Sequence, residues 1–167
     1  MNAVNVGAWS ANWVWSLPLI VLTIVIHVIG LGLINESLVR TLSGTMERGG
    51  FMAKFSVVMG ITALLATLLH GVEAAIWAAA YQLLGTLPDI KSAVLYSLSA
   101  MTSYGHANLF LEEQWQLMGA LERLNGMLLF WLTTAVLFAM IQKVLLRSRA
   151  RHRQAYCKIS HYRNSRE

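Results

Sequence analysis

Three stretches of this sequence are apolar over a length that suits a helix crossing a membrane. They run from about Leu17 to Ile34, from Phe55 to Leu84 and from Leu124 to Leu146. The first has about 18 residues without a charge, which at 1.5 Å per residue crosses most of a ~30 Å hydrocarbon core. All three lack the alternation of a barrel strand. The sequence therefore predicts an all-α membrane protein with three transmembrane helices.

The composition supports this class and argues against several others. Only 13% of the residues are charged and the mean hydropathy is +0.54, whereas about a quarter of the residues in soluble domains are charged. The single cysteine, Cys157, excludes an intrachain disulfide. No nucleophile–base set, phosphate-binding glycine loop or zinc-type spacing of cysteine and histidine is present. We therefore expect no enzyme, no resident cofactor and no metal site.

The basic residues predict the orientation in the membrane. Three of the 13 lie between the first two spans and eight in the last residues of the third span and the tail, whereas two lie between the second and third spans and none before the first. Loops rich in Lys and Arg stay in the cytoplasm. We expect a multi-pass protein of the cell (inner) membrane, its N-terminus outside and its C-terminus cytoplasmic. The net charge of +5 thus reflects topology and contact with lipid, not nucleic-acid binding.

The segment between the second and third spans is too apolar for an ordinary loop. Pro88 and Asp89 suit the start of a helix, where a carboxylate meets the positive end of the dipole. Ile90–Met101 is apolar but has only 12 residues, which predicts a re-entrant helix that does not cross the bilayer. A small polar run, Thr102–His106, follows it. A short helix that leads into such a run has the layout of a pore loop.

The stretch from Ala93 to Gln142 resembles the pore module of bacterial potassium-type channels with two core helices per subunit. The resembling residues are AVLYSLSAMTSYGHANL and WQLMGALERLNGMLLFWLTTAVLFAMIQ, and HGVEAAIWAAAYQLLG resembles the preceding outer helix. The resemblance implies that residues 55–146 form a pore module. Residues 1–54 then form an extra helix and a cytoplasmic loop, and residues 147–167 a basic cytoplasmic tail. It also implies a homotetramer that conducts K⁺ or other monovalent cations passively.

The filter sequence departs from this family. Aligned on the Tyr-Gly pair, serine stands in place of the first filter glycine and histidine in place of the aspartate. Serine resists the positive φ that glycine adopts readily, so we expect weakened K⁺ selectivity. The candidate filter residues are Thr102, Ser103, Tyr104, Gly105 and His106.

Further polar residues are candidates for the pore and for its support. His70 and Glu73 form an i, i+3 pair inside the second span, where an ionisable group must face protein or water. We expect this pair either to satisfy itself structurally or to support the pore loop. Candidates for the pore lining or its acidic mouth are Met101, Glu112, Glu113, Glu122, Thr133 and Thr134.

Two other functions remain open from the sequence alone. One is a small membrane scaffold or regulatory subunit without transport. The other is a b-type haem protein that uses His27 and His70, since two imidazoles on facing helices can hold a haem.

The second span also carries a small residue at every fourth position, which predicts close helix packing within or between chains. These residues are Ala63, Thr67, Gly71, Ala75 and Ala79.

Overall fold

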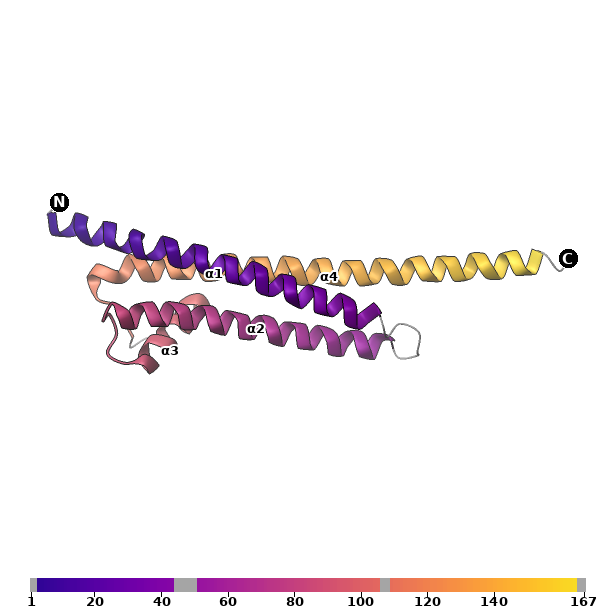
Figure 1. The fold of residues 1–167 in the computed structure, drawn as a ribbon, viewed down its shortest axis with the longest axis horizontal. Helices are drawn as coiled ribbons and strands as arrows, with labels where there is room; N and C mark the ends of the chain where they lie inside the picture. The colour runs from indigo at the N-terminus through magenta and orange to yellow at the C-terminus, as the bar shows by residue number, and fades with distance from the viewer. Residues whose placement is uncertain (1–2, 44–50, 106–108, 165–167) are drawn as a thin grey trace. The chain divides into compact units, whose positions relative to one another are not determined.

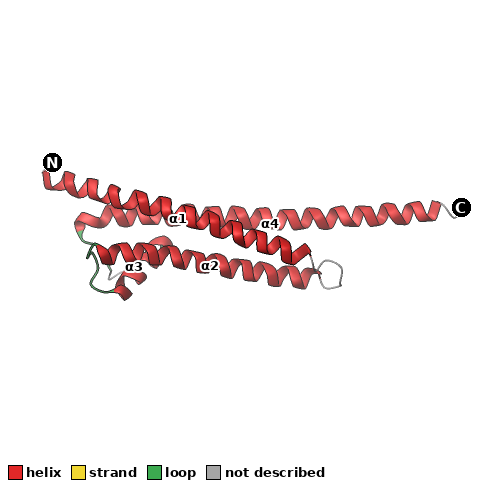
Figure 2. Ribbon diagram, in the orientation of Figure 1, coloured by secondary structure: helices red, strands yellow, loops and turns green. Residues whose placement is uncertain are grey.

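The structure, a computed structural model, describes residues 3–43, 51–105 and 109–164 (Figure 1). Within these ranges the chain is helical, apart from its connecting loops, and contains no strand (Figure 2). The elements are α1 (Ala3–Ser43), α2 (Phe51–Leu83), α3 (Ile90–Met101), the 3-10 helix η1 (Glu113–Trp115) and α4 (Gln116–Asn164). The chain divides into two units, residues 1–131 and 132–167, which are described separately.

Three helical segments are long and apolar enough to cross a membrane. They are Trp9–Ser37, Phe55–Leu83 and Glu113–Lys143, so the predicted number of spans is confirmed. The third begins earlier than the sequence suggested. Its predicted start was placed after the charges of Glu122 and Arg123, yet both residues lie inside this apolar helix. A charged residue marks the end of a span only when its side chain faces water. Glu122 is fully buried, so it does not mark the start of the third span.

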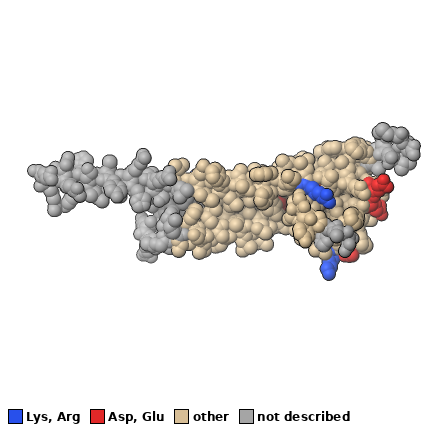
Figure 3. Space-filling view, turned by 180° about the vertical axis from the view of Figure 1, so that it is seen from behind, with Lys and Arg blue, Asp and Glu red and all other residues tan. Residues whose placement is uncertain are grey.

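The described part of residues 1–131 buries several polar side chains beside its apolar core and exposes many large apolar ones. Along α1 the buried side chains include Ser16, Thr23 and His27, whereas Val21 and Val25 are exposed. Figure 3 shows a face that carries few charged side chains, with the acidic ones gathered at one end. This is the reverse of a soluble protein, and it fits a surface in contact with lipid tails, where backbone groups must be satisfied within helices.

The helices α1 and α2 run in opposite directions, as Figure 1 shows. Two buried asparagines connect α1 and α4. Asn12 donates from Nδ2 to the carbonyl of Gln114 (2.6 Å) and accepts from the N–H of Met118 (2.8 Å). Deeper in, Asn125 donates to the hydroxyl of Thr23 (2.8 Å). The N-terminal end of α1 is thereby held beside the start of α4.

The short helix α3 has the predicted bounds, and Asp89 caps its N-terminus. The Asp89 carboxylate accepts from the Ser92 N–H at 2.8 Å and from the Ser92 hydroxyl at 2.9 Å. The backbone hydrogen bond from Ser92 lowers the pKa of Asp89, so the cap is charged at neutral pH. Such a cap satisfies N–H groups that the first turn leaves open. It fixes where α3 begins, beside the end of α2.

The C-terminal end of α3 lies well inside the bundle. Met101 packs in a buried cluster with Ala74 of α2 and Leu129 of α4, and a Cβ on Gly126 would lie 2.6 Å from the Met101 carbonyl oxygen. Ala74 is about 14 Å along α2 from Leu83, and Gly126 is about 15 Å along α4 from its first residue, at 1.5 Å per residue. Both measures place the end of α3 about 15 Å from these two helix ends, which is half the length needed to cross a ~30 Å hydrocarbon layer.

The chain returns from this depth to the end at which α3 began. Leu111 belongs to the same buried cluster as Tyr96 and Met118, and η1 follows it at the start of α4. Residues 109–111 therefore lie back beside the first turn of α4. Residues 106–108, which include the candidate filter residue His106, lie outside the described residues.

The second unit contains the rest of α4, described up to Asn164. The tail that the sequence marks as basic therefore continues the helix. Thr133 is buried and Thr134 is exposed, because neighbouring positions on a helix point about 100° apart. The two threonines predicted to line the pore therefore do not share one face.

Gly126 offers a direct test of the close contact between α3 and α4. We expect Gly126→Ala to destabilise the protein by about 1–3 kcal/mol, the usual result of overpacking, because the obstructing atoms belong to the Met101 backbone. Thermal unfolding in detergent measures the effect. The control is Gly32→Ala, because a Cβ at this helical glycine meets nothing within 4 Å. Equal melting temperatures for the two variants would contradict the close contact.

Candidate functional site

Two buried polar clusters and one exposed backbone run form the candidate site. The first cluster joins three helices around the carboxylate of Glu122. Tyr81 donates to Glu122 Oε2 at 2.7 Å, and Ser97 donates to Glu122 Oε1. The Ser97 hydroxyl also lies 2.8 Å from the carbonyl oxygen of Ala74. Since Tyr81, Ser97 and Glu122 belong to α2, α3 and α4, this cluster fixes α3 at its depth.

Aromatic packing surrounds this carboxylate and excludes water. Tyr81 meets Tyr96 edge to face, with ring centroids 5.4 Å apart, and Trp77 and Met118 are fully buried in the same cluster. The Tyr96 hydroxyl lies against Gly119, where any side chain would collide with it. Burial raises the pKa of Tyr96, so its hydroxyl stays neutral. The prediction that Glu122 lies at an exposed mouth is therefore wrong, because it is an interior residue behind α3.

The second cluster brings together His27, His70 and Glu73, near the middle of the first two spans. His27 Nδ1 lies 2.7 Å from Glu73 Oε1, and His70 Nδ1 lies 3.2 Å from Glu73 Oε2. The predicted His70–Glu73 contact is thus confirmed. His27 joins it from α1, which sequence spacing could not show across 46 positions. We call these three residues the histidine–glutamate cluster.

The two imidazoles of this cluster do not fit the haem alternative. Their ring centroids are 4.9 Å apart, with an interplanar angle of 42°, and both Nδ1 atoms are turned toward one carboxylate. Two axial ligands must instead approach the iron from opposite faces of a flat macrocycle. Each Nδ1 atom instead has an oxygen of Glu73 as its neighbour.

The run Thr102–Gly105 begins as a helix cap. The Ser103 N–H donates to the carbonyl of Ala100 and the Tyr104 N–H to that of Ser99, both at 3.0 Å. This pair of bonds is the Schellman arrangement, which ends a helix with one residue in the left-handed conformation. Ser103 takes that position. The chain thus leaves α3 with these N–H groups already satisfied by carbonyls of the helix.

The φ angles of this run alternate in sign. Thr102 has a φ of −87°, Ser103 of 55° and Gly105 of 70°. Ser103 is the one non-glycine residue with a positive φ in the described parts of the chain, so Tyr104 returns to a negative value. The left-handed conformation costs a non-glycine residue about 1–2 kcal/mol. The strain that the sequence predicted at Ser103 is therefore present.

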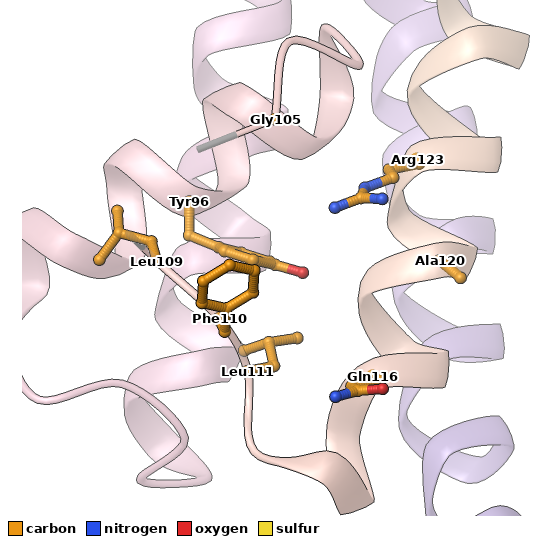
Figure 4. A pocket seen from close by; sticks show the side chains of 8 residues that line it. All are labelled: Tyr96, Gly105, Leu109, Phe110, Leu111, Gln116, Ala120 and Arg123. Atoms are coloured by element: carbon orange, nitrogen blue, oxygen red, sulfur yellow. The ribbon is translucent and has the colours of Figure 1, made fainter. Parts of the chain in front are cut away.

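All four residues of the run are exposed in the single chain, and Tyr104 is 82% exposed. Two cavities adjoin the run. One, of about 480 Å³, is lined by Gly105, Tyr96 and Arg123 among others, and Figure 4 shows the Arg123 guanidinium directed toward the Tyr96 hydroxyl. The other, of about 560 Å³, is lined by Thr102, Ser103 and His70 among others. The second cavity thus connects the run with the histidine–glutamate cluster.

The remaining predicted residues are placed as follows. Glu112 and Glu113 are exposed at the start of η1, just before α4, whereas Met101 is buried at the end of α3. The small-residue row of α2, from Ala63 to Ala79, is exposed throughout, and a Cβ on Gly71 meets nothing within 4 Å. Among the described residues this row makes no close helix contact, so the prediction of close packing is left with contact between chains.

No family model matches this sequence, and neither a curated protein nor a solved structure is significantly similar to it.

The Glu122 cluster makes a testable contribution to stability. We expect Tyr81→Phe to destabilise the protein by about 1–3 kcal/mol, the usual cost of leaving a buried acceptor without its partner, because Glu122 Oε2 loses its donor in a fully buried site. Denaturation in detergent measures the change. Tyr104→Phe is the control, since it removes a hydroxyl from a ring that is 82% exposed. A Tyr81→Phe variant as stable as the control would refute this role of the cluster.

Proposed function

We propose that this chain is the subunit of a pore-loop cation channel, in which α3 is the pore helix and Thr102–Gly105 the ion-coordinating segment. One observation carries the proposal: a non-helical, exposed run follows a short helix whose end is packed about 15 Å along α2 and α4, half the length needed to cross a membrane. Irregular backbone at that depth is tolerated only where protein or a water-filled cavity surrounds it. The run is thus suited to the inside of an assembly and unsuited to lipid.

A symmetric assembly of several chains can surround an ion with oxygen atoms, which a single chain cannot do. One copy of the run offers a few oxygens on one side of an ion, whereas copies around an axis surround it. We propose a homotetramer, as the resemblance to potassium-type channels implies. The exposed small-residue row on α2 is a surface that permits close approach of a neighbouring copy.

The chemistry of the run favours a cation. The N–H groups of Ser103 and Tyr104 are already bonded to α3, so an ion in this segment meets carbonyl and hydroxyl oxygens. Alternating signs of φ turn successive carbonyls toward one side, which is the arrangement by which a filter replaces a hydration shell. The C-terminal end of α3, the negative end of its dipole, adjoins the run.

The charges around the outer end agree with entry of cations. Asp89, Glu112 and Glu113 are exposed there, against Lys91 and Arg123. A net negative mouth raises the local concentration of cations. With the N-terminus outside and the C-terminus cytoplasmic, this mouth faces outward. The ions proposed are K⁺ and other monovalent cations, moving down their electrochemical gradient.

The proposal predicts that Gly105→Val abolishes flux without abolishing assembly. Valine resists the φ of 70° at this position, so the carbonyl path is lost. The measurement is K⁺ flux into proteoliposomes, with particle size checked by chromatography. The control is Gly85→Val, which imposes the same strain at a φ of 64° in the turn after α2. Flux that survives Gly105→Val, or that both variants lose equally, would refute the assignment of the filter.

Replacement of the strained serine tests selectivity in the same assay. Ser103→Gly removes a conformational cost of about 1–2 kcal/mol per subunit and restores the residue type that suits a φ of 55°. We expect the ratio of K⁺ to Na⁺ flux to rise above that of the unmodified protein. Ser103→Ala, which keeps the strain, is the control. An unchanged ratio in Ser103→Gly would show that Ser103 does not limit selectivity.

A further inference from the structure

We infer that the histidine–glutamate cluster is a binding site for a divalent transition-metal ion of the Zn²⁺ class. The inference is independent of the channel proposal. It also reverses the expectation of no metal site, which followed from sequence spacing alone. His27 and Glu73 have no exposed surface, and His70 supplies the third group. Each residue offers one ligand atom, and these atoms lie within 4.8 Å of one another.

The Glu73 oxygen that faces His70 marks the position for the ion. Glu73 Oε1 lies 2.7 Å from His27 Nδ1 and is hydrogen-bonded. Glu73 Oε2 is buried and makes no hydrogen bond within the described residues, although His70 Nδ1 is 3.2 Å away. A buried acceptor whose neighbouring nitrogen makes no well-formed hydrogen bond is costly, and a bound ion would satisfy the oxygen and the nitrogen together. A cation at Oε2 would have imidazole nitrogens on two sides.

The donor set selects the class of ion. Imidazole nitrogen suits Zn²⁺, Cu²⁺ and Ni²⁺, whereas Ca²⁺ and Mg²⁺ prefer sites made of oxygen alone. Two histidines and one glutamate form a known three-ligand set for Zn²⁺, with a fourth position left for water. Ligands in a tetrahedral zinc site are about 3.3 Å apart, given bonds of about 2.0 Å. The present separations, from 2.7 Å to at most 4.8 Å, lie on both sides of this value.

His70 also provides the route of entry. Its side chain is 27% exposed, whereas those of His27 and Glu73 are fully buried. It lines the cavity of about 560 Å³ that Thr67, Thr102 and Ser103 also line. Most of the cavity lining is apolar, but an ion that enters it meets the His70 side chain and the hydroxyl-bearing residues beside it, and so reaches the cluster. The carboxylate of Glu73 offsets part of its charge, as an ionisable group inside a membrane requires a partner.

The test measures metal binding directly on the full chain in detergent. The starting protein carries His152→Gln, Cys157→Ser and His161→Gln, which removes adventitious ligands from the tail. Equilibrium dialysis with Zn²⁺ should give one ion per chain, and Co²⁺ should give the intense visible bands of tetrahedral coordination. Zinc should also raise the melting temperature, because it binds the folded state. Mg²⁺ at the same concentration should do neither.

Substitution at His70 separates binding from folding. We expect His70→Gln to lower Zn²⁺ affinity at least tenfold, and His70→Cys to restore it with a thiolate-to-cobalt absorption band. His70 is partly exposed, so both variants should fold, as helicity and chromatography will check. Glu73→Gln should also lose the ion. Absence of saturable binding, or binding that survives both His70→Gln and Glu73→Gln, would overturn the site.

Discussion

The structure depends on the need to satisfy polar side chains inside a protein whose surface is apolar. Glu122 has no exposed surface and takes donors from Tyr81 and Ser97, on two other helices. Loss of either donor leaves a buried carboxylate with one partner, and the surrounding lipid can supply none. The cluster therefore fixes the relation of α2, α3 and α4 in a way that non-directional apolar packing cannot. The depth of α3 follows from it.

The position of the α3 end bears on the surroundings of the run that follows it, Thr102–Gly105. A non-helical segment at an outer surface would be an ordinary loop, but Thr102–Gly105 lies beyond a helix end packed on Gly126. Its exposure in one chain is then what the proposed assembly would explain, because other copies would cover it. The same reasoning applies to the exposed row of small residues on α2. Both features are accounted for if several copies enclose the run around a common axis.

The sequence predicted the helices better than their contacts. The three spans and the bounds of Ile90–Met101 follow from hydropathy, length and the Asp89 cap, which are local properties. The partner of His27 did not follow, because Glu73 is 46 positions away. Glu122 was misplaced for a related reason. A charged residue type suggested contact with water, whereas its hydrogen-bond donors, Tyr81 and Ser97, are distant in the sequence and are seen only in the fold. Residue type indicated strain at Ser103, which its φ bears out.

The central claim is that Thr102–Gly105 lies on the axis of a symmetric assembly. The most direct measurement is an electron cryo-microscopy structure of the purified protein in lipid nanodiscs. We expect four chains around one axis, with the carbonyls of this segment facing that axis and density for ions between them when K⁺ is present. A monomer, or an assembly in which the segment faces lipid far from any axis, would contradict the account.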